Sequence, residues 1–123
     1  MELKLGESEY RFAQIVWEQE PVASGQLVKL CAERLGWKKS TTYTVLKNLC
    51  AKGVLYNENA TVTALVKQSE VQRLQSTQLV QQTFGGSLPG FVAAFLHQNS
   101  ISAEEAAEIQ ALIDRYKEGE RHD

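Results

Sequence analysis

The hydrophobic pattern of this chain changes its period at Gly53, and this change restricts the possible folds more than any other feature. Before Gly53, apolar side chains recur at the three- and four-residue spacing of short amphipathic helices. After it come two short β-prone runs, residues 54–56 and 61–66, with the NENA segment between them as a turn. Three short helices followed by a small hairpin is the element order of a winged helix-turn-helix domain.

The limits of the first two helices are also predicted by local signals. The first helix covers residues 7–19 and ends before Pro21, because proline cannot continue a helix. Val22 can then form a very short strand. Ser24 is a good N-cap for the second helix, which Gly36 ends.

The third predicted helix lies in residues 37–53, WKKSTTYTVLKNLCAKG, a window with four lysines and no acidic residue. The whole chain has a formal net charge of -2, so the positive charge is local. On a helical wheel one side is suited to docking on the domain and consists of Thr42, Val45, Leu46 and Leu49. The opposite side presents short hydroxyl groups, with Tyr43 at its border.

This second side has the chemistry of a DNA-recognition helix. Short hydroxyl side chains allow close approach to a duplex, tyrosine can stack on a sugar or a thymine methyl group, and lysines neutralise phosphates. We therefore predict DNA contacts from Lys38, Lys39, Ser40, Thr41, Tyr43, Thr44 and Lys47. The alternative is an ordinary surface helix with solvated lysines, which the absence of acids and the third-helix position disfavour.

After Lys67 the chain becomes helical again and rich in glutamine, with a break at Gly85-Gly86. Ser87 can cap a fifth helix, and Ser102 with Glu105 forms an S-x-x-E capping box for a last one. The expected fold is mainly α with a small β-hairpin. It comprises a winged helix-turn-helix domain at residues 1–67 and a helical dimerisation domain at residues 68–123.

The predicted C-terminal helices carry more large apolar side chains than three short helices can bury alone. Burying one such side chain is worth about 1.5–3 kcal/mol, so a second copy of the chain is the expected cover. The residues predicted to form this dimer interface are Leu79, Phe84, Phe91, Phe95, Ile109, Leu112 and Ile113.

Catalytic, metal and membrane functions have little support in the sequence. Cys31 and Cys50 lack the spacing of a metal site or a nucleophile pair, and His97 and His122 are isolated. The longest apolar run is far shorter than the roughly 20 residues of a membrane span. We expect a cytoplasmic protein with reduced thiols that is not an enzyme, needs no cofactor or metal, and does not insert into membranes.

Several segments together resemble the BlaI/MecI/CopY family of bacterial repressors, the penicillinase repressor type. The strongest is W-x-x-S-T-T-Y-T-V-L-K-N-L-x-x-K-G at residues 37–53, which resembles the family's recognition helix. Further similar segments follow in family order: residues 7–17, 22–28, 84–92 and 102–114. The resemblance implies a homodimer, held together by the C-terminal arm, that represses transcription by occupying a palindromic operator.

Three positions depart from the family pattern. The wing, NENATVT at residues 57–63, has one acid and no base, which puts phosphate contacts by the wing in doubt. In β-lactam-responsive relatives a membrane sensor triggers cleavage of an Asn-Phe bond, which corresponds here to Ala94-Phe95. We favour dimer-core packing for Phe95. A membrane sensor protease system is the alternative partner that the resemblance implies. The tail, KEGERHD, lacks the Cys-x-Cys motifs of copper-sensing relatives.

A different class of function is also compatible with this sequence. The net negative charge and the acid-bearing wing would suit a winged-helix dimer that binds a protein rather than DNA. Binding to DNA at low salt discriminates between these two hypotheses.

Overall fold

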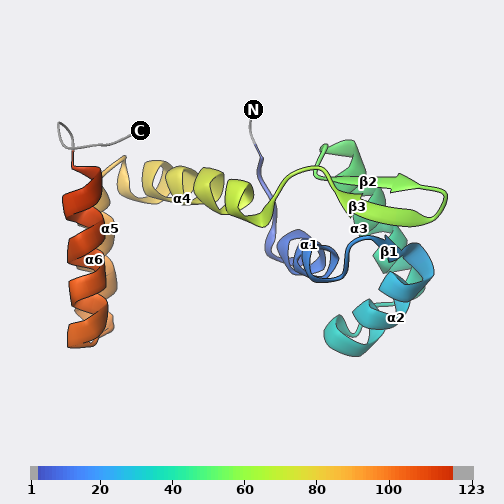
Figure 1. Cartoon of the computed structure of the whole chain (residues 1–123), viewed down its shortest axis with the longest axis horizontal. Helices are drawn as coiled ribbons and strands as arrows, with labels where there is room; N and C mark the ends of the chain where they lie inside the picture. The colour runs from blue at the N-terminus through green and yellow to red at the C-terminus, as the bar shows by residue number, and fades with distance from the viewer. Residues whose placement is uncertain (1–2, 118–123) are drawn as a thin grey trace. The chain divides into compact units, whose positions relative to one another are not determined.

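The structure is a computed structural model and describes residues 3–117. The chain divides into two compact units, residues 1–79 and residues 80–123 (Figure 1). The first unit contains three helices, a small sheet and most of a fourth helix. The mainly α architecture with a winged helix-turn-helix domain and a helical arm is therefore confirmed.

The elements of the first unit follow the predicted order. They are α1 (Glu7–Gln19), β1 (Val22–Ala23), α2 (Ser24–Leu35), α3 (Lys39–Ala51), β2 (Leu55–Glu58) and β3 (Thr61–Ala64). The strands form an antiparallel sheet in the order β1-β3-β2, so β3 is central. Gly36 ends α2 in the left-handed conformation, with φ of 70°, as its position predicted.

The predicted N-cap at Ser24 is wrong by one residue. Ala23 is the N-cap of α2, and Ser24 is already helical and buried. The reason is the sheet: Val22 pairs with Val62 and Ala23 with Thr61, and the Ser24 N–H donates to the Ala60 carbonyl at 2.8 Å. Strand pairing fixes the residues just before α2, and the helix begins without a capping side chain.

The turn of the hairpin is shorter than the predicted four-residue segment. Glu58 pairs with Thr61, so the strands extend inward and only Asn59 and Ala60 form the turn. Both have positive φ, 53° and 61°, as a two-residue turn of this kind requires. Asparagine accepts this conformation readily, whereas alanine is strained in it.

Replacing Ala60 with glycine is therefore expected to stabilise the protein by about 0.5–1 kcal/mol, since glycine has no Cβ to clash at positive φ. Thermal unfolding followed by circular dichroism measures the effect. The matched control is Ala32→Gly in α2, where the same change inside a helix should destabilise by about 1 kcal/mol. A lower melting temperature for Ala60→Gly would contradict the assigned turn.

The core of the first unit lies between α1, α2, α3 and the sheet. Phe12 is fully buried in α1 and stacks on Trp37, with ring centroids 6.0 Å apart. Trp17 is partly buried, and its indole Nε1–H donates to the Val66 carbonyl at 2.9 Å. Besides Ala13 and Val16, which follow one helical stripe, Phe12 and Ile15 are also buried, because α1 is covered on more than one side.

The second unit contains the end of α4 (Gln68–Phe84), together with α5 (Leu88–Gln98) and α6 (Ala103–Tyr116). The two last helices lie side by side (Figure 1). Ser87 Oγ accepts from the Gly90 N–H, and Ser102 Oγ accepts from the Glu105 N–H, so both predicted caps are confirmed. The two compact units divide inside α4, between residues 79 and 80. The boundary at residues 67/68 between a DNA-binding domain and a dimerisation domain stays a prediction.

Candidate nucleic-acid interface

The α3 helix is held on the first unit by the face predicted to dock. Thr42, Leu46 and Leu49 are buried in the core, and Val45 is partly buried against it. The buried hydroxyl group of Thr42 has a hydrogen-bond partner, because its Oγ1 donates to the Lys38 carbonyl at 3.2 Å. A helix fixed along one side in this way presents its other side at a defined angle.

The side predicted to read DNA is exposed. All of its members lie on the surface of α3 or at its N-cap: Lys38, Lys39, Ser40, Thr41, Tyr43, Thr44 and Lys47. Tyr43 is 38% exposed and lies at the border, as the helical wheel indicated. The Thr44 Oγ1–H donates to the Ser40 carbonyl at 2.9 Å, so the hydroxyl oxygen can still accept a hydrogen bond.

The electrostatics of this surface favour an anion. Within residues 3–117, the ammonium groups of Lys38, Lys39 and Lys47 form no ion pair or hydrogen bond. The first turn of α3 contains no acid, and no side chain caps its N-terminus. Backbone N–H groups at a helix start and unpaired lysines attract phosphate together.

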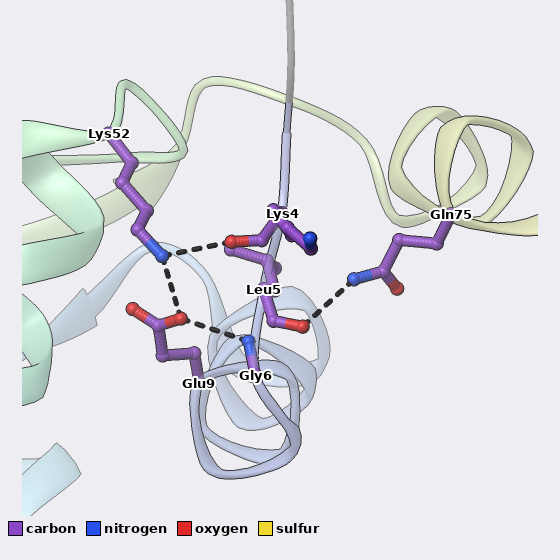
Figure 2. Close-up of polar contacts among 6 residues, drawn as sticks. All are labelled: Lys4, Leu5, Gly6, Glu9, Lys52 and Gln75. Atoms are coloured by element: carbon purple, nitrogen blue, oxygen red, sulfur yellow. Dashed lines mark hydrogen bonds and ion pairs between the residues drawn. The ribbon is translucent and has the colours of Figure 1, made fainter. Parts of the chain in front are cut away.

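The fourth lysine of the basic window has a different role. Lys52 is the C-cap of α3, and its Nζ donates to the Lys4 carbonyl at 2.9 Å and to Glu9 Oε1 at 2.8 Å (Figure 2). Burial by itself would raise the pKa of Glu9, but the hydrogen bonds from Lys52 and the Gly6 N–H, with the Lys52 charge, lower it overall. Lys52 is thus engaged inside the molecule rather than directed to a ligand.

Two apolar side chains beside α3 were missed by the sequence analysis. Tyr56 on β2 and Leu65 after β3 are exposed, and with Tyr43 and Lys47 they line a hollow of about 520 Å³. The signal for Tyr56 is its alternation with buried Leu55 in a strand, which places it outward. Its hydroxyl donates to Glu58 Oε2 at 2.9 Å, so the acid of the wing has a partner.

In the second unit, the residues predicted for a dimer interface divide into two groups. Phe84 and Phe91 are half-buried and pack edge to face on each other, with centroids 5.5 Å apart. The others are exposed: Phe95 on α5, and Ile109, Leu112 and Ile113 on α6. Leu79, the last residue of the first compact unit, is also exposed.

A groove of about 390 Å³ lies between α5 and α6. Its apolar lining includes Phe91, Val92, Phe95, Leu96, Ile109 and Ile113. Val92 was not among the predicted interface residues, although it lies one turn from Phe95. The Ala94-Phe95 bond lies inside α5, and whether it is cleaved stays a prediction.

Within the described part of the chain, no group of side chains is arranged for nucleophilic chemistry or metal binding. Burial raises the pKa of the Cys31 and Cys50 thiols, which makes them less reactive. No group of three His, Cys, Asp or Glu side chains within residues 3–117 is placed to hold a metal ion. His97 is exposed, and His122 lies outside the described residues. None of the described helices has the length and apolarity needed to cross a membrane.

A recognition-type helix docked beside a three-stranded sheet with a hairpin wing defines the winged helix-turn-helix class of DNA-binding domain. Comparison with known proteins gives the family. The family model described as "Penicillinase repressor" matches residues 5–115, and the chain belongs to this family. It is a family of DNA-binding transcriptional repressors and not of enzymes, in agreement with the resemblance in the sequence.

Two relatives are similar over most of their length. The chain is 20% identical over 118 residues to a penicillinase repressor of Bacillus licheniformis, covering 93% of this chain and 92% of the relative. It is 27% identical over 110 residues to a protein of Latilactobacillus sakei described as an "Uncharacterized 16.5 kDa protein in ptsI 3'region". That alignment covers 86% of this chain and 75% of the relative.

Proposed function

We propose that this protein is a homodimeric repressor that occupies a palindromic operator through α3. The observation that carries the proposal is the exposed side of α3, where hydroxyl groups, Tyr43 and three lysines gather without a single acid on the helix. Among residues 3–117 these lysines form no ion pair. A carboxylate on this side would repel phosphate, so its absence fits contact with a duplex.

Each kind of side chain on α3 has a distinct task in this proposal. Lys38 and Lys39 lie at the N-terminus of α3, where they and the free backbone N–H groups would hold phosphates and set the register. Ser40, Thr41 and Thr44 are short enough for base edges to approach closely. The residues toward the middle of the helix, Tyr43 and Lys47, would reach the adjacent backbone.

The dimer is supported by the apolar groove between α5 and α6. Phe95, Ile109 and Ile113 line it and are about half exposed in a single chain. Exposed apolar surface of this kind is buried at interfaces, and a second copy of the same groove is the simplest cover. Two α3 helices related by a twofold axis would read half-sites one helical turn apart, about 34–36 Å, or a multiple of it.

The salt dependence of operator binding tests the assigned phosphate contacts. The wing offers no base, so three lysines per subunit, six per dimer, predict a slope of log K against log salt of about -5.4. Replacing Lys47 with methionine keeps the aliphatic stem and removes the charge. We expect it to make the slope shallower by about 1.8, because the dimer loses two phosphate contacts.

The matched control for this titration is Lys29→Met on α2, an exposed lysine outside α3. It removes the same charge and should leave the slope close to the wild-type value. A Lys47→Met slope indistinguishable from wild type would place Lys47 away from phosphate and contradict its assignment.

The function itself is tested by selecting bound fragments from a genomic library and titrating the purified protein against them. We expect a specific complex at about 50 mM salt with two protein chains per operator. A folded dimer that binds no fragment under these conditions would reject the proposal and favour a protein-binding role. The genes beside the selected fragments would identify what is regulated.

A further inference from the structure

The N-terminal strap, residues 3–6, joins α3 and α4, two helices that are both far from it in the sequence. It is extended, and the side chains of Leu3 and Leu5 are buried in the core. Its successive carbonyls are used on opposite sides (Figure 2). The Lys4 carbonyl accepts from Lys52 Nζ at 2.9 Å, and the Leu5 carbonyl accepts from Gln75 Nε2 at 3.2 Å. The strap therefore links the end of α3 to α4.

Glu9 holds the α3 side of this link. Its Oε1 accepts from Lys52 Nζ at 2.8 Å and from the Gly6 N–H at 3.0 Å, so one carboxylate fixes both the lysine and the end of the strap. The Lys52 side chain is still 40% exposed, and an ion pair so open to solvent adds little to stability. Its consequence is geometric: the C-terminal end of α3 is tied to the start of α1 and to the strap.

The α4 side of the link is a stripe of glutamines. Gln68, Gln72 and Gln75 follow the i, i+4, i+7 spacing of one helix face, and the buried side chain of Val71 lies between them. Gln68 Nε2 and Gln72 Nε2 both donate to the Tyr10 hydroxyl, at 3.1 and 3.3 Å. One buried valine and three amide hydrogen bonds are a weak attachment, but hydrogen bonds are directional and orient the helix.

We propose that Lys52 and Gln75 are positioning residues for DNA binding: through the strap they fix the direction of α4 relative to α3, and so select the half-site spacing that a dimer accepts. This inference rests on the proposed function. The helix α4 continues from this attachment to Phe84, the first of the aromatic residues assigned to the dimer arm. An inserted base pair turns one half-site about 34–36° around the duplex, since one turn takes 10–10.5 base pairs. A dimer whose α4 direction is fixed cannot follow that rotation freely.

The test uses the full chain and the selected operator, together with operators that have one or two base pairs added or removed between the half-sites. For the wild type we expect a preference of about tenfold for one spacing over its neighbours. In Lys52→Met and in Gln75→Ala we expect this preference to fall to about threefold or less. Neither change should alter the slope of log K against log salt, because neither residue contacts phosphate.

Two controls separate a positioning effect from a direct phosphate contact and from a general effect of mutating α4. Lys47→Met should make the salt slope shallower and keep the spacing preference, as expected for a direct contact. Gln82→Ala removes a glutamine of α4 whose side chain forms no hydrogen bond among the described residues, and it should change neither quantity. Circular dichroism confirms that each variant is folded. Gln75 meets the strap through a single hydrogen bond on the α4 side, so its variant tests the proposal independently of Lys52→Met.

Two results would overturn the inference while the proposed function stands. One is a wild-type spacing preference in both variants, and the other is a Lys52→Met salt slope as shallow as that of Lys47→Met. A wild-type protein that binds no operator rejects the proposed function instead, and the inference with it.

Discussion

Replacing Phe95 with glutamate is expected to convert the proposed dimer into a monomer and to lower affinity for the full operator by about 10²- to 10⁴-fold. The Phe95 side chain is 48% exposed in one chain and lines the groove between α5 and α6. A carboxylate at this position would have to be buried without a partner when two chains associate. Without association, the second half-site no longer binds as an intramolecular event, and its contribution to affinity is lost.

Sedimentation equilibrium at micromolar concentration measures the first effect, and operator titration measures the second. The matched control is Ala93→Glu, which places the same charge on the same helix, almost opposite Phe95 on a helical wheel and outside the groove. The control should remain a dimer with nearly wild-type affinity. A Phe95→Glu protein that still sediments as a dimer would show that the groove is not the interface. It would also contradict the interpretation that Phe95 packs in the dimer core.

Replacing Thr44 with glutamate is expected to lower operator affinity by about 100-fold at low salt, which corresponds to about 2.7 kcal/mol of binding free energy. The change places an acid in each of the two α3 helices, on a side with none, where it would face the phosphates of the duplex. The fold should tolerate it. Thr44 is exposed, its hydroxyl contacts only the Ser40 carbonyl, and glutamate forms helices better than threonine.

Operator titration over a range of salt concentrations tests this prediction, because screening should make the loss smaller as salt rises. Gln14→Glu in α1 is the control for net charge: it adds the same charge at an exposed position outside α3. We expect the control to bind within about threefold of wild type. Equal losses in the two variants would mean that overall charge, rather than the surface of α3, governs binding.

Much of the first unit could be predicted because its signals are local. The limits of α1 agree with the prediction, since Pro21 stops the helix and acids at Glu7 and Glu9 favour its start. The errors occur where distant segments pair. Ser24 is a helical residue rather than a cap because β1 pairs with β3, and the hairpin turn is only Asn59-Ala60 because Glu58 pairs with Thr61. Strand register depends on contacts that local propensity does not contain.

The candidate DNA-binding side was predictable for a related reason. All of its residues lie on or next to one helix of 13 residues, so spacing in the sequence translates directly into position in space. The family resemblance then supplied the function that this surface chemistry suits. Tyr56 was missed because it belongs to a strand that only the folded sheet brings beside α3.

Lys52 shows what the tertiary structure alone decided. In the sequence it is one of four lysines in a basic window, equivalent to Lys38, Lys39 and Lys47. By itself the sequence determined the order of helices and strands, the two sides of α3 and the membership of a repressor family, because these depend on periodicity and motif. The partners of Lys52 are Glu9 and the Lys4 carbonyl, more than 40 residues earlier, and those of the α4 glutamines are 58 to 70 residues earlier. Such contacts form only when the core brings remote segments together, so packing decided which lysines stay exposed on α3 and which one is tied to the rest of the domain.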